Sequence, residues 1–347
     1  MGVNIALFDD LDAVAEDAGG ALTREKQPGM FDRLAWFRLV NDFTPPKGKP
    51  LVIRAKNGKA SAWLFMARSG GSAVPLSNWY SLRYGPVVEG ADGDAAVAAL
   101  AQGLREAGIG ALSLSPMVGD DPLPAALKRQ GWMTRRSPST TNWRIRTGGM
   151  SFEDYWASRP SRLRNTAKRR AKAAKLDLVV HHGFHADAWE DYESVYNASW
   201  KPAEGSPPLM RTFAETEGAA GTLRLGLAYH EGQPVAAQLW TVEHGAATIH
   251  KLAYREDSRQ LSPGTVLSME MFRRAIDEDK VDVIDFGIGD DGYKRDWMEE
   301  AVPLYALTAY DLRSVSGLAG LGRSLASKLV RRVRSLYAAP QRENQGE

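Results

Sequence analysis

Hydrophobic positions in the first 147 residues change between two periods, which indicates a mixture of helices and strands. Apolar residues recur at helical spacing in residues 31–43, ahead of a Pro-Pro pair, and in residues 94–108, which end at a glycine. Residues 49–70 predict a hairpin that turns at Asn57 and Gly58. The other expected elements are a strand and a short helix in 3–20, strands at 79–88, 111–117 and 132–146, and a short helix at 121–131.

The second half repeats this order after the Gly148–Gly149 pair. A basic helix and a strand at 176–182 lead to a helix at 187–200. Three antiparallel strands are expected between residues 222 and 257, with turns at Glu231-Gly232 and His244-Gly245. A helix after the SPG sequence at 262–264, a strand at 281–286, a short helix and a strand at 304–310 complete the expected elements.

Because the two halves share one order of elements, the sequence predicts an α/β fold with a mixed α+β sheet. The expected domains are residues 1–147 and 150–312, followed by a tail at 313–347.

The composition is that of a soluble globular protein, with 44% hydrophobic and 25% charged residues. The chain has no cysteine, which excludes disulfides, thiolate metal sites and a cysteine nucleophile. No apolar run reaches the roughly 18 residues of a membrane-spanning helix. The acidic N-terminal stretch lacks the features of a secretory signal or a myristoylation site. We therefore expect a cytoplasmic protein.

An unusual stretch, DFGIGDDGYKRDWMEE at 285–300, follows an apolar strand. Gly287, Gly289 and Gly292 match the G-x-G-x-x-G fingerprint of dinucleotide sites. That fingerprint requires a long helix after the third glycine and further strands beyond it. Here a charged segment runs into Pro303, and only a short tail remains. We exclude a dinucleotide site and expect this stretch to form the rim of an active site in another fold.

The segment RQLSPGT at 259–265 has the features of a phosphate-binding helix start. Pro263 suits the first helical position, and the small Gly264 and Thr265 leave backbone N–H groups free. The helix dipole contributes only about 0.3–1 kcal/mol, so N–H bonds and Arg259 would supply the rest. A helix start without a ligand is the alternative interpretation.

These segments resemble a known family. Residues 258–276 (SRQLSPGTVLSMEMFRRAI), followed by VDVIDFGIGDDGYKRDW, resemble the GNAT acetyltransferase superfamily, and most closely its double-domain FemAB/CelD-like (BioF2-like) branch. The similarity covers about residues 30–312 and is strongest from 223 to 298. It implies two tandem GNAT-like domains, of which the first is degenerate, and acetyl-CoA or another acyl-CoA as the donor, without a metal.

The superfamily's pyrophosphate loop reads Q/R-x-x-G-x-G/A, and residues 259–264 fit it with a serine in place of the first glycine. The resemblance implies a donor site at Arg259, Gln260, Ser262, Gly264 and Thr265. It also implies that the strand after this helix splays from its neighbour, and that the acyl group meets the acceptor there.

Tyr293, Lys294 and Trp297 match the branch's aromatic-Lys-x-x-aromatic pattern. The resemblance implies that Lys294 stabilises negative charge on the tetrahedral intermediate or on a substrate phosphate. It gives Tyr293 the role of protonating the leaving thiolate, and Trp297 a place at the substrate. The alternative is an exposed helix start with Trp297 anchored in the core.

The general base is left open between three residues. An amine with a pKa near 10.4 costs about 4–5 kcal/mol to deprotonate at pH 7, so a base would help. Many relatives use a carboxylate on the strand before the loop, but ATIHKLAY has none. His250 lies on that strand and titrates in a suitable range. Asp285 and Asp290 are the acidic alternatives, and a structural role for the histidine competes with the catalytic one.

The segment 161–175 carries seven Lys or Arg and no acid. Arg164, Lys168 and Lys172 fall on one helical face, which could hold the phosphate of a nucleotide-sugar, a lipid-linked precursor or a tRNA. The segment lacks the aromatic residues that base stacking uses, so we expect phosphate contacts and no DNA partner. A solvated helix is the alternative.

Residues 312–341 of the tail carry basic residues and no acid. Among them lies an apolar stripe made of Leu318, Leu321, Leu325, Leu329 and Val333. It either docks on the protein's own surface or lies on an anionic membrane. His181, His182 and His185 are clustered without carboxylate or thiol partners at ligand spacing, so no metal is expected.

The expected function is acyl transfer from acyl-CoA to an amine or hydroxyl of a phosphate-bearing or lipid-linked sugar precursor of the cell envelope. An aminoacyl-tRNA-dependent transferase that extends cell-wall peptides is one alternative. A non-catalytic GNAT-shaped scaffold that regulates polysaccharide synthesis is another.

Overall fold

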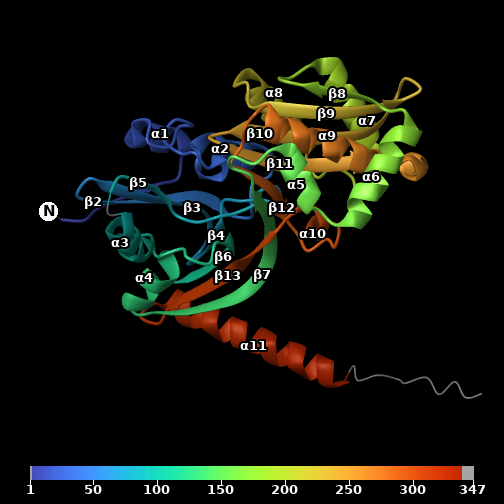
Figure 1. Ribbon diagram of the computed structural model, residues 1–347. Helices are drawn as coiled ribbons and strands as arrows, with labels where there is room; N and C mark the ends of the chain where they lie inside the picture. The colour runs from blue at the N-terminus through green and yellow to red at the C-terminus, as the bar shows by residue number, and fades with distance from the viewer. Residues whose placement is uncertain (1, 92, 338–347) are drawn as a thin grey trace, which may run out of the picture.

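The computed structural model describes residues 2–91 and 93–337, with side chains as far as residue 327. In the part described, the strands join into one long mixed sheet with helices on both faces (Figure 1). The first half contributes strands β1 (Asn4–Phe8), β2 (Lys49–Asn57), β3 (Ala60–Ser69), β4 (Ser72–Pro75), β5 (Val87–Glu89), β6 (Ala111–Met117) and β7 (Trp132–Arg146). Its helices are α1 (Leu11–Ala18), α2 (Leu34–Phe43), α3 (Gly93–Glu106) and α4 (Leu123–Arg129), with a 3-10 turn η1 (Met30–Asp32).

The second half contributes strands β8 (Asp177–His181), β9 (Leu223–His230), β10 (Gln233–Glu243), β11 (Ala246–Tyr254), β12 (Val283–Ile288) and β13 (Glu300–Asp311). Its helices are α5 (Phe152–Ser158), α6 (Ser161–Ala174), α7 (Ala186–Asn197), α8 (Pro207–Ala219), α9 (Pro263–Asp277), α10 (Lys294–Trp297) and α11 (Val315–Tyr337), with a 3-10 turn η2 (Glu256–Leu261).

The two halves exchange their last strands. The order is β1-β2-β3-β4-β6-β13-β7-β12-β11-β10-β9-β8, with β5 paired to β3 beside this path. β13 therefore lies between β6 and β7, while β7 lies between β13 and β12. β13 pairs antiparallel with β7 from Glu300↔Arg144 to Asp311↔Trp132. The predicted mixed α/β fold is confirmed, and hydrogen-bonded pairing makes the two halves one sheet.

Alternate strand residues of the second half face two separate hydrophobic cores, as the pleat of a strand requires. In β9, Leu227 faces a core that includes residues of α2, α7 and α8. Its neighbour Ala228 faces a core that includes residues of α5, α6 and α9. The sheet thus has one face toward α9 and another toward α7, α8 and the first half.

The hairpin turns form where the sequence predicts them. Gly58 has φ 62°, Glu231 and Gly232 have φ 51° and 78°, and His244 and Gly245 have φ 47° and 72°. Two consecutive left-handed residues are typical of the type I′ turn, whose twist matches that of paired strands. These turns set the β2–β3, β9–β10 and β10–β11 registers.

Residues 76–86 form a loop, although the sequence predicts a strand over 79–88. A local turn interrupts the strand, because the Asn78 side chain accepts from Tyr80 N at 3.0 Å and its carbonyl accepts from Ser81 N at 3.1 Å. Only Val87–Glu89 pair, as β5. The 76–86 loop instead extends toward the second half.

A second irregular segment, residues 198–206, joins α7 to α8, and we name it the strap. The predicted helix runs to residue 200, but α7 ends at Asn197. Ser199 forms an antiparallel bridge with Arg255 at the end of β11. Ala198 O also accepts from Glu256 N at 3.2 Å. The strap therefore begins along the open end of β11.

Helix α11 leaves the body of the molecule after its first turns (Figure 1). Gly317 packs so closely that an added Cβ would lie 2.1 Å from Asp311 O. Further along, Leu318 and Leu325 are 54% and 55% exposed, so this part of the apolar stripe is not docked. Leu329 and Val333 lie outside the side chains described. Among the helices described, none combines the length and apolarity needed to cross a bilayer.

Candidate active site

Strands β11 and β12 separate soon after they begin. Their parallel pairing runs from Ala246↔Val283 to Thr248↔Asp285 and then stops. In the described part of the chain, the rest of β11 has no strand on that side, and Gly287 has φ 72°. Backbone groups of this β11 edge therefore have no ladder partner and can bind a ligand. The strand separation that the resemblance implies is present.

A bulge in β11 lies beside this splay. Leu239 pairs with Lys251 and Trp240 pairs with Ile249, so His250 is the extra residue. The bulge re-aims the side chains that follow, and Lys251 points toward α7 and the first half, where its ammonium lies 4.6 Å from the Tyr80 ring centroid.

The predicted donor loop forms the start of α9. Ser262 is left-handed (φ 52°, ψ 46°), which explains why glycine suits this position. No side chain caps this helix start among the described residues. An added Cβ on Gly264 would lie 3.1 Å from the Tyr254 ring, so the backbone packs tightly there. Arg259 and Gln260 are exposed and Thr265 is half-buried. The structure therefore brings these five residues to one helix start behind the splay.

Lys294 does not have the place that the resemblance implies. Its side chain is buried, and its ammonium donates to Ile288 O at 2.7 Å and to Gly287 O at 3.4 Å. Asp291 lies 3.9 Å away. Burial is the main cause that lowers the pKa of Lys294. Because its donors reach two backbone carbonyls, Lys294 holds the turn after β12 in place.

Tyr293 is more open, at 45% exposed, and its ring lies 5.7 Å from that of Phe286. Desolvation raises the pKa of Tyr293 to about 12, so its hydroxyl stays protonated at neutral pH. Trp297, in contrast, is 5% exposed, and its ring centroid lies 4.9 Å from that of Phe272 with the two rings tilted. The ring packs in the core, which is the place that the alternative interpretation gives to Trp297.

Asp285 lines a cavity of about 450 Å³ on the sheet face away from α9. Ile284 and Phe286 point into the α9 core, so Asp285 between them points to the opposite face. Its carboxylate accepts from Asn142 Nδ2 at 2.8 Å and from Gly287 N at 2.7 Å. Desolvation is the largest cause that raises the pKa of Asp285 above the usual carboxyl value. A carboxylate with a raised pKa is a stronger base.

The other two candidate bases are poorly placed. His250 Nε2 lies 2.9 Å from Thr241 Oγ1, and burial lowers the pKa of His250 to about 3. A lowered pKa makes the imidazole a weaker base, and its hydrogen bond to Thr241 gives it a structural partner. Asp290 is exposed and pairs with Arg295 at 3.1 Å. Among the three candidates, only Asp285 combines a cavity, fixed orientation and a raised pKa.

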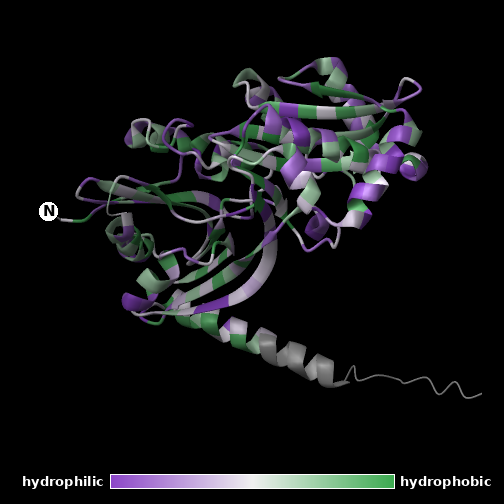
Figure 2. Cartoon of the chain, viewed as in Figure 1, coloured by the Kyte–Doolittle hydropathy of each residue, from purple (hydrophilic) through white to green (hydrophobic). Residues whose placement is uncertain are grey.

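The basic helix α6 lies beside the donor loop. It contacts α9 and η2, and its apolar face buries Leu163 and Ala167, as the helical spacing predicts. Arg164 is half-buried and donates to Arg159 O at 3.1 Å, whereas Lys168 and Lys172 are exposed. Figure 2 shows α6 as largely hydrophilic. The two lysines are therefore available to a phosphate near η2.

The first half has a similar splay between β4 and β6, but its own residues fill it. These strands pair only at Ser72↔Ala111 and Ala73↔Leu112. Tyr84 is buried there, with its N–H donating to Pro116 O at 2.7 Å and its hydroxyl to Phe65 O. The first turn of α3 is acidic, which disfavours phosphate. The open splay therefore lies in the second half.

The strap supplies residues that sequence patterns miss. Lys251 Nζ lies 2.7 Å from Glu204 Oε2, and Tyr80 of the 76–86 loop donates its hydroxyl to the same carboxylate. Lys201 follows Trp200, whose ring lies 4.3 Å from that of Tyr254. No spacing rule connects residues so far apart in the chain. The weak signal is a run of Trp, Lys, Pro and Gly at 200–205, which is unusual for a solvent loop.

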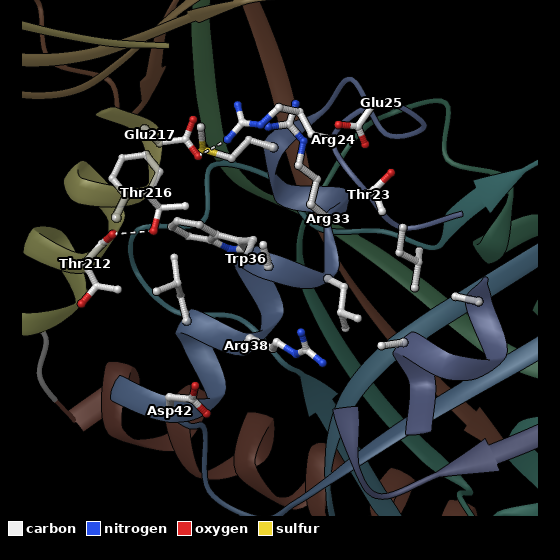
Figure 3. A pocket seen from close by; sticks show the side chains of 18 of the residues that line it. Thr23, Arg24, Glu25, Arg33, Trp36, Arg38, Asp42, Thr212, Thr216 and Glu217 are labelled. Carbon is white, nitrogen blue, oxygen red and sulfur yellow. Dashed lines mark hydrogen bonds and ion pairs between the residues drawn. The ribbon is translucent and has the colours of Figure 1, made fainter. Parts of the chain in front are cut away.

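Another cavity, of about 770 Å³, lies between α1, α2 and α8 (Figure 3). Arg24 on its wall pairs with Glu217 at 2.7 Å and with Glu243 at 2.5 Å. Arg33 also pairs with Glu243, at 2.7 Å. These ion pairs join the two halves of the chain. None of the predicted site residues lines this groove, so the cavity at Asp285 is the better acceptor site.

Two other features of the sequence are the clustered histidines and the segment after Gly292. The His181 and His185 rings lie 5.0 Å apart, and the described residues contain no group of three potential metal ligands. The segment after Gly292 forms only a short helix, α10, before β13 begins. This segment therefore lacks the long helix that the dinucleotide fingerprint requires after its third glycine.

Comparisons with known proteins agree with this geometry. Residues 157–295 match the family model of the acetyltransferase (GNAT) domain. The fold is similar to that of a conserved protein of unknown function from Bacteroides thetaiotaomicron (TM-score 0.56, 13% identity, 88% of this chain and 100% of that chain). It is also similar to FemX (TM-score 0.55, 10% identity, 79% and 94%).

A third similar structure is the C-terminal domain of a proposed lysylphosphatidylglycerol synthetase from Agrobacterium fabrum (TM-score 0.53, 13% identity, 76% and 85%). No curated protein sequence matches the chain. Residues 157–295 are therefore similar to a GNAT acetyltransferase domain, and the chain as a whole is similar in fold to FemX.

Proposed function

We propose that this protein transfers an acyl group from acyl-CoA to an amine or hydroxyl of a phosphate-bearing precursor of the cell envelope or of an exopolysaccharide. One observation carries the proposal: the β11 edge is open beside an uncapped helix start, and a cavity with a basic carboxylate lies on the other face of the sheet. Acyl transfer requires that the thioester of the donor and the amine or hydroxyl of the acceptor come together at one place.

The residues present fit an acyl-CoA donor. Phosphates would lie at the N–H groups of α9, near Arg259 and Thr265. The unpaired edge of β11 would bind the amides of an extended ligand in the way that one strand binds another. When bound, acyl-CoA supplies the activated acyl group. Tyr293, which keeps its proton at neutral pH, is a proton donor at the same end of β12.

Asp285 acts as the general base in this proposal. Asn142 and Gly287 N orient its carboxylate, so that it can accept the proton of an amine or hydroxyl in the cavity. The Asn142 side-chain nitrogen donates to Asp285. The side-chain oxygen of Asn142 is buried and has no hydrogen-bond partner among the described residues. That oxygen can accept a hydrogen bond from the acceptor and fix its position.

Two arginines at the same cavity support a phosphate-bearing acceptor. Arg144 pairs with Glu300 at 2.6 Å, and Arg83 pairs with Asp32. Their side chains are 36% and 40% exposed, so each keeps donors for a ligand. Forked guanidinium groups suit phosphate better than they suit a neutral sugar.

A second candidate is an aminoacyl-tRNA-dependent transferase. The exposed lysines of α6 beside η2 favour it, because a tRNA offers phosphates over a wider surface than CoA does. The serine at position 262, where the superfamily has glycine, fits a modified donor loop.

We also propose contact between α11 and an anionic membrane. Leu318 and Leu325 of its apolar stripe are exposed, and basic residues flank the stripe in the sequence. Such a contact would hold the enzyme near a lipid-linked precursor.

The proposed function is tested by release of free thiol when acetyl-CoA is mixed with amino-sugar nucleotides. Wild-type protein should release thiol with at least one acceptor, and the Asp285→Asn variant should not. If wild-type protein consumes charged tRNA and not acetyl-CoA, the second candidate replaces the first. If it consumes neither, a non-catalytic role replaces both.

A further inference from the structure

Four polar residues form a row across neighbouring strands on one wall of the Asp285 cavity. Thr241 of β10 pairs with Thr248 of β11, Thr248 pairs with Asp285 of β12, and Asp285 pairs with Arg144 of β7. Residues that are paired directly across two strands point to the same face of the sheet. All four line the cavity of about 450 Å³. The wall therefore presents two hydroxyls, a carboxylate and a guanidinium in that order.

The apolar neighbours of this row confirm the face to which it points. Ala247 and Ile249, on either side of Thr248, lie in the core that packs against α9. The residues on either side of Asp285 and Arg144 lie in the same core: Ile284, Phe286, Trp143 and Ile145. Because side chains alternate along a strand, the polar residues face away from α9. Their order is fixed by strand register and does not depend on a loop.

The middle of the row has unfilled hydrogen-bonding capacity. Thr248 is half-buried, and its hydroxyl makes no hydrogen bond among the described residues. The Thr241 hydroxyl, in contrast, lies 2.9 Å from His250 Nε2 and already has a partner. The buried side-chain oxygen of Asn142, whose nitrogen donates to Asp285, is also unpartnered. A ligand beside Asp285 can therefore bind to Thr248 on one side.

The other side of Asp285 carries positive charge. Glu300 accepts from Arg144 at 2.6 Å and from Arg146 at 3.0 Å. Two guanidinium groups thus share one carboxylate, which leaves one positive charge at this end of the row. The Arg144 side chain is 36% exposed and keeps donors for an anion.

We infer that the acceptor is a 2-amino sugar with a phosphate ester on its anomeric carbon, and that Thr248 selects it by binding the hydroxyl on the far side of the amine. This inference rests on the proposed function, because it names the acceptor of the same site. The anomeric phosphate, the amine and the 3-hydroxyl of such a sugar occupy three adjacent ring carbons. Their order matches that of Arg144, Asp285 and Thr248 across the sheet.

The transfer forms an amide bond between the sugar nitrogen and the acyl carbon and breaks the carbon–sulfur bond of the thioester. The nitrogen enters as a neutral amine, and the proton that it loses passes to Asp285. The sulfur leaves as a thiolate and takes the proton of Tyr293. Exchange with water returns both residues to their starting states.

Two isomeric acceptors test the order of the row. Glucosamine 1-phosphate and glucosamine 6-phosphate carry the same groups, but only the first has its phosphate beside the amine. 3-Deoxyglucosamine 1-phosphate lacks the hydroxyl assigned to Thr248, and UDP-glucosamine carries the anomeric phosphate within a nucleotide. Thiol release at saturating acetyl-CoA gives kcat/KM for each acceptor.

The variants separate hydroxyl, charge and fold. Thr248→Val keeps the shape of the side chain without its hydroxyl, and Thr248→Ser keeps the hydroxyl. Arg144→Met removes the charge. Thr308→Val is the matched control, because Thr308 is a half-buried strand residue of β13 that does not line the cavity.

Wild-type protein should prefer glucosamine 1-phosphate to the 6-phosphate by about 10- to 100-fold in kcat/KM, as a hydrogen-bonded charge contributes. Arg144→Met should lose most of that preference. Thr248→Val should lower kcat/KM for glucosamine 1-phosphate about tenfold and leave that for the 3-deoxy sugar unchanged. Thr248→Ser should restore most of the rate, and Thr308→Val should behave as wild type.

The ratio between UDP-glucosamine and glucosamine 1-phosphate shows which source of the phosphate ester is used, and either order supports the inference. Equal kcat/KM for the two isomers would overturn the inference and leave the proposed function in place. A loss in Thr248→Val that persists with the 3-deoxy sugar would also overturn it, as would acylation of other amines or alcohols only. If folded wild-type protein releases thiol with no acceptor, the proposed function itself fails.

Discussion

Leu82 of the first half lies against Gly287 of the second half, with its Cδ2 only 3.3 Å from the point that a Cβ on Gly287 would occupy. The same point is 3.6 Å from Ile249 O of β11. The 76–86 loop therefore packs against the splay at the residue where β12 turns away. One half of the chain shapes the site of the other half.

Replacing Gly287 with alanine should destabilise the protein by about 1–2 kcal/mol, since φ is 72° there and the new methyl group would press on Leu82. Urea unfolding measures the loss. Gly292→Ala is the matched control, because nothing lies within 4 Å of that Cβ position and its φ is ordinary. Equal midpoints for the two variants would show that Gly287 carries no strain.

Asp285→Asn should lower the acyl-transfer rate by about 10²–10⁴ without weakening the fold. The raised pKa of Asp285 means that ionisation opposes folding: its contribution to stability is full below the unfolded pKa and is lost as pH rises through the folded pKa. A neutral amide therefore keeps or increases stability at pH 7. Rate assays with thermal unfolding test both statements.

The pH profile gives a separate test of the same residue. Activity should fall on the acid side as Asp285 gains its proton, at a pH above that of an ordinary aspartate. Asp290→Asn makes the same chemical change at an exposed residue and should leave rate and profile unchanged. An unchanged acid limb in Asp285→Asn, if activity persists, would remove Asp285 as the base.

Ser262→Gly should stabilise the protein by about 1 kcal/mol, because glycine adopts the left-handed conformation of residue 262 without strain. Donor affinity should be kept. Ser258→Gly, in the preceding η2 turn and without positive φ, should not stabilise. A loss of stability in Ser262→Gly would mean that the serine side chain contributes more than its backbone strain costs.

Membrane contact through α11 is tested by flotation with vesicles that contain anionic lipid. Truncation after residue 322 keeps the packed Gly317 and Gly320, so the body should stay folded while flotation is lost. High salt should release the full chain, because screening weakens contacts between basic residues and lipid. Failure of the full chain to float would end the membrane proposal.

Local features of the fold were predictable from sequence. Glu231-Gly232 and His244-Gly245 predict turns because left-handed residues set the hairpin twist, and Gly58 is left-handed in the β2–β3 turn. The helix start at Pro263 was predictable because helix-start chemistry is local. These features depend on neighbours in the chain, so the sequence pattern contains them.

Features that depend on distant segments were missed or misplaced. Lys294 and Trp297 match a pattern, but their surroundings decide that one supports a turn and the other fills a core. The strand predicted at 79–88 became a loop because Asn78 offers a competing turn. Glu204 gains meaning only from Lys251 of β11 and from the 76–86 loop, which no spacing rule connects to it.

Hydrogen exchange with and without saturating acetyl-CoA tests the central claim most directly. The account predicts protection in residues 249–266, where the β11 edge and the α9 start lie, and in the turn after β12. Residues 72–86 and 111–117, which surround the filled splay of the first half, should exchange as before. Protection confined to that first-half splay or to the α2–α8 groove, or no protection in folded protein, would contradict the account.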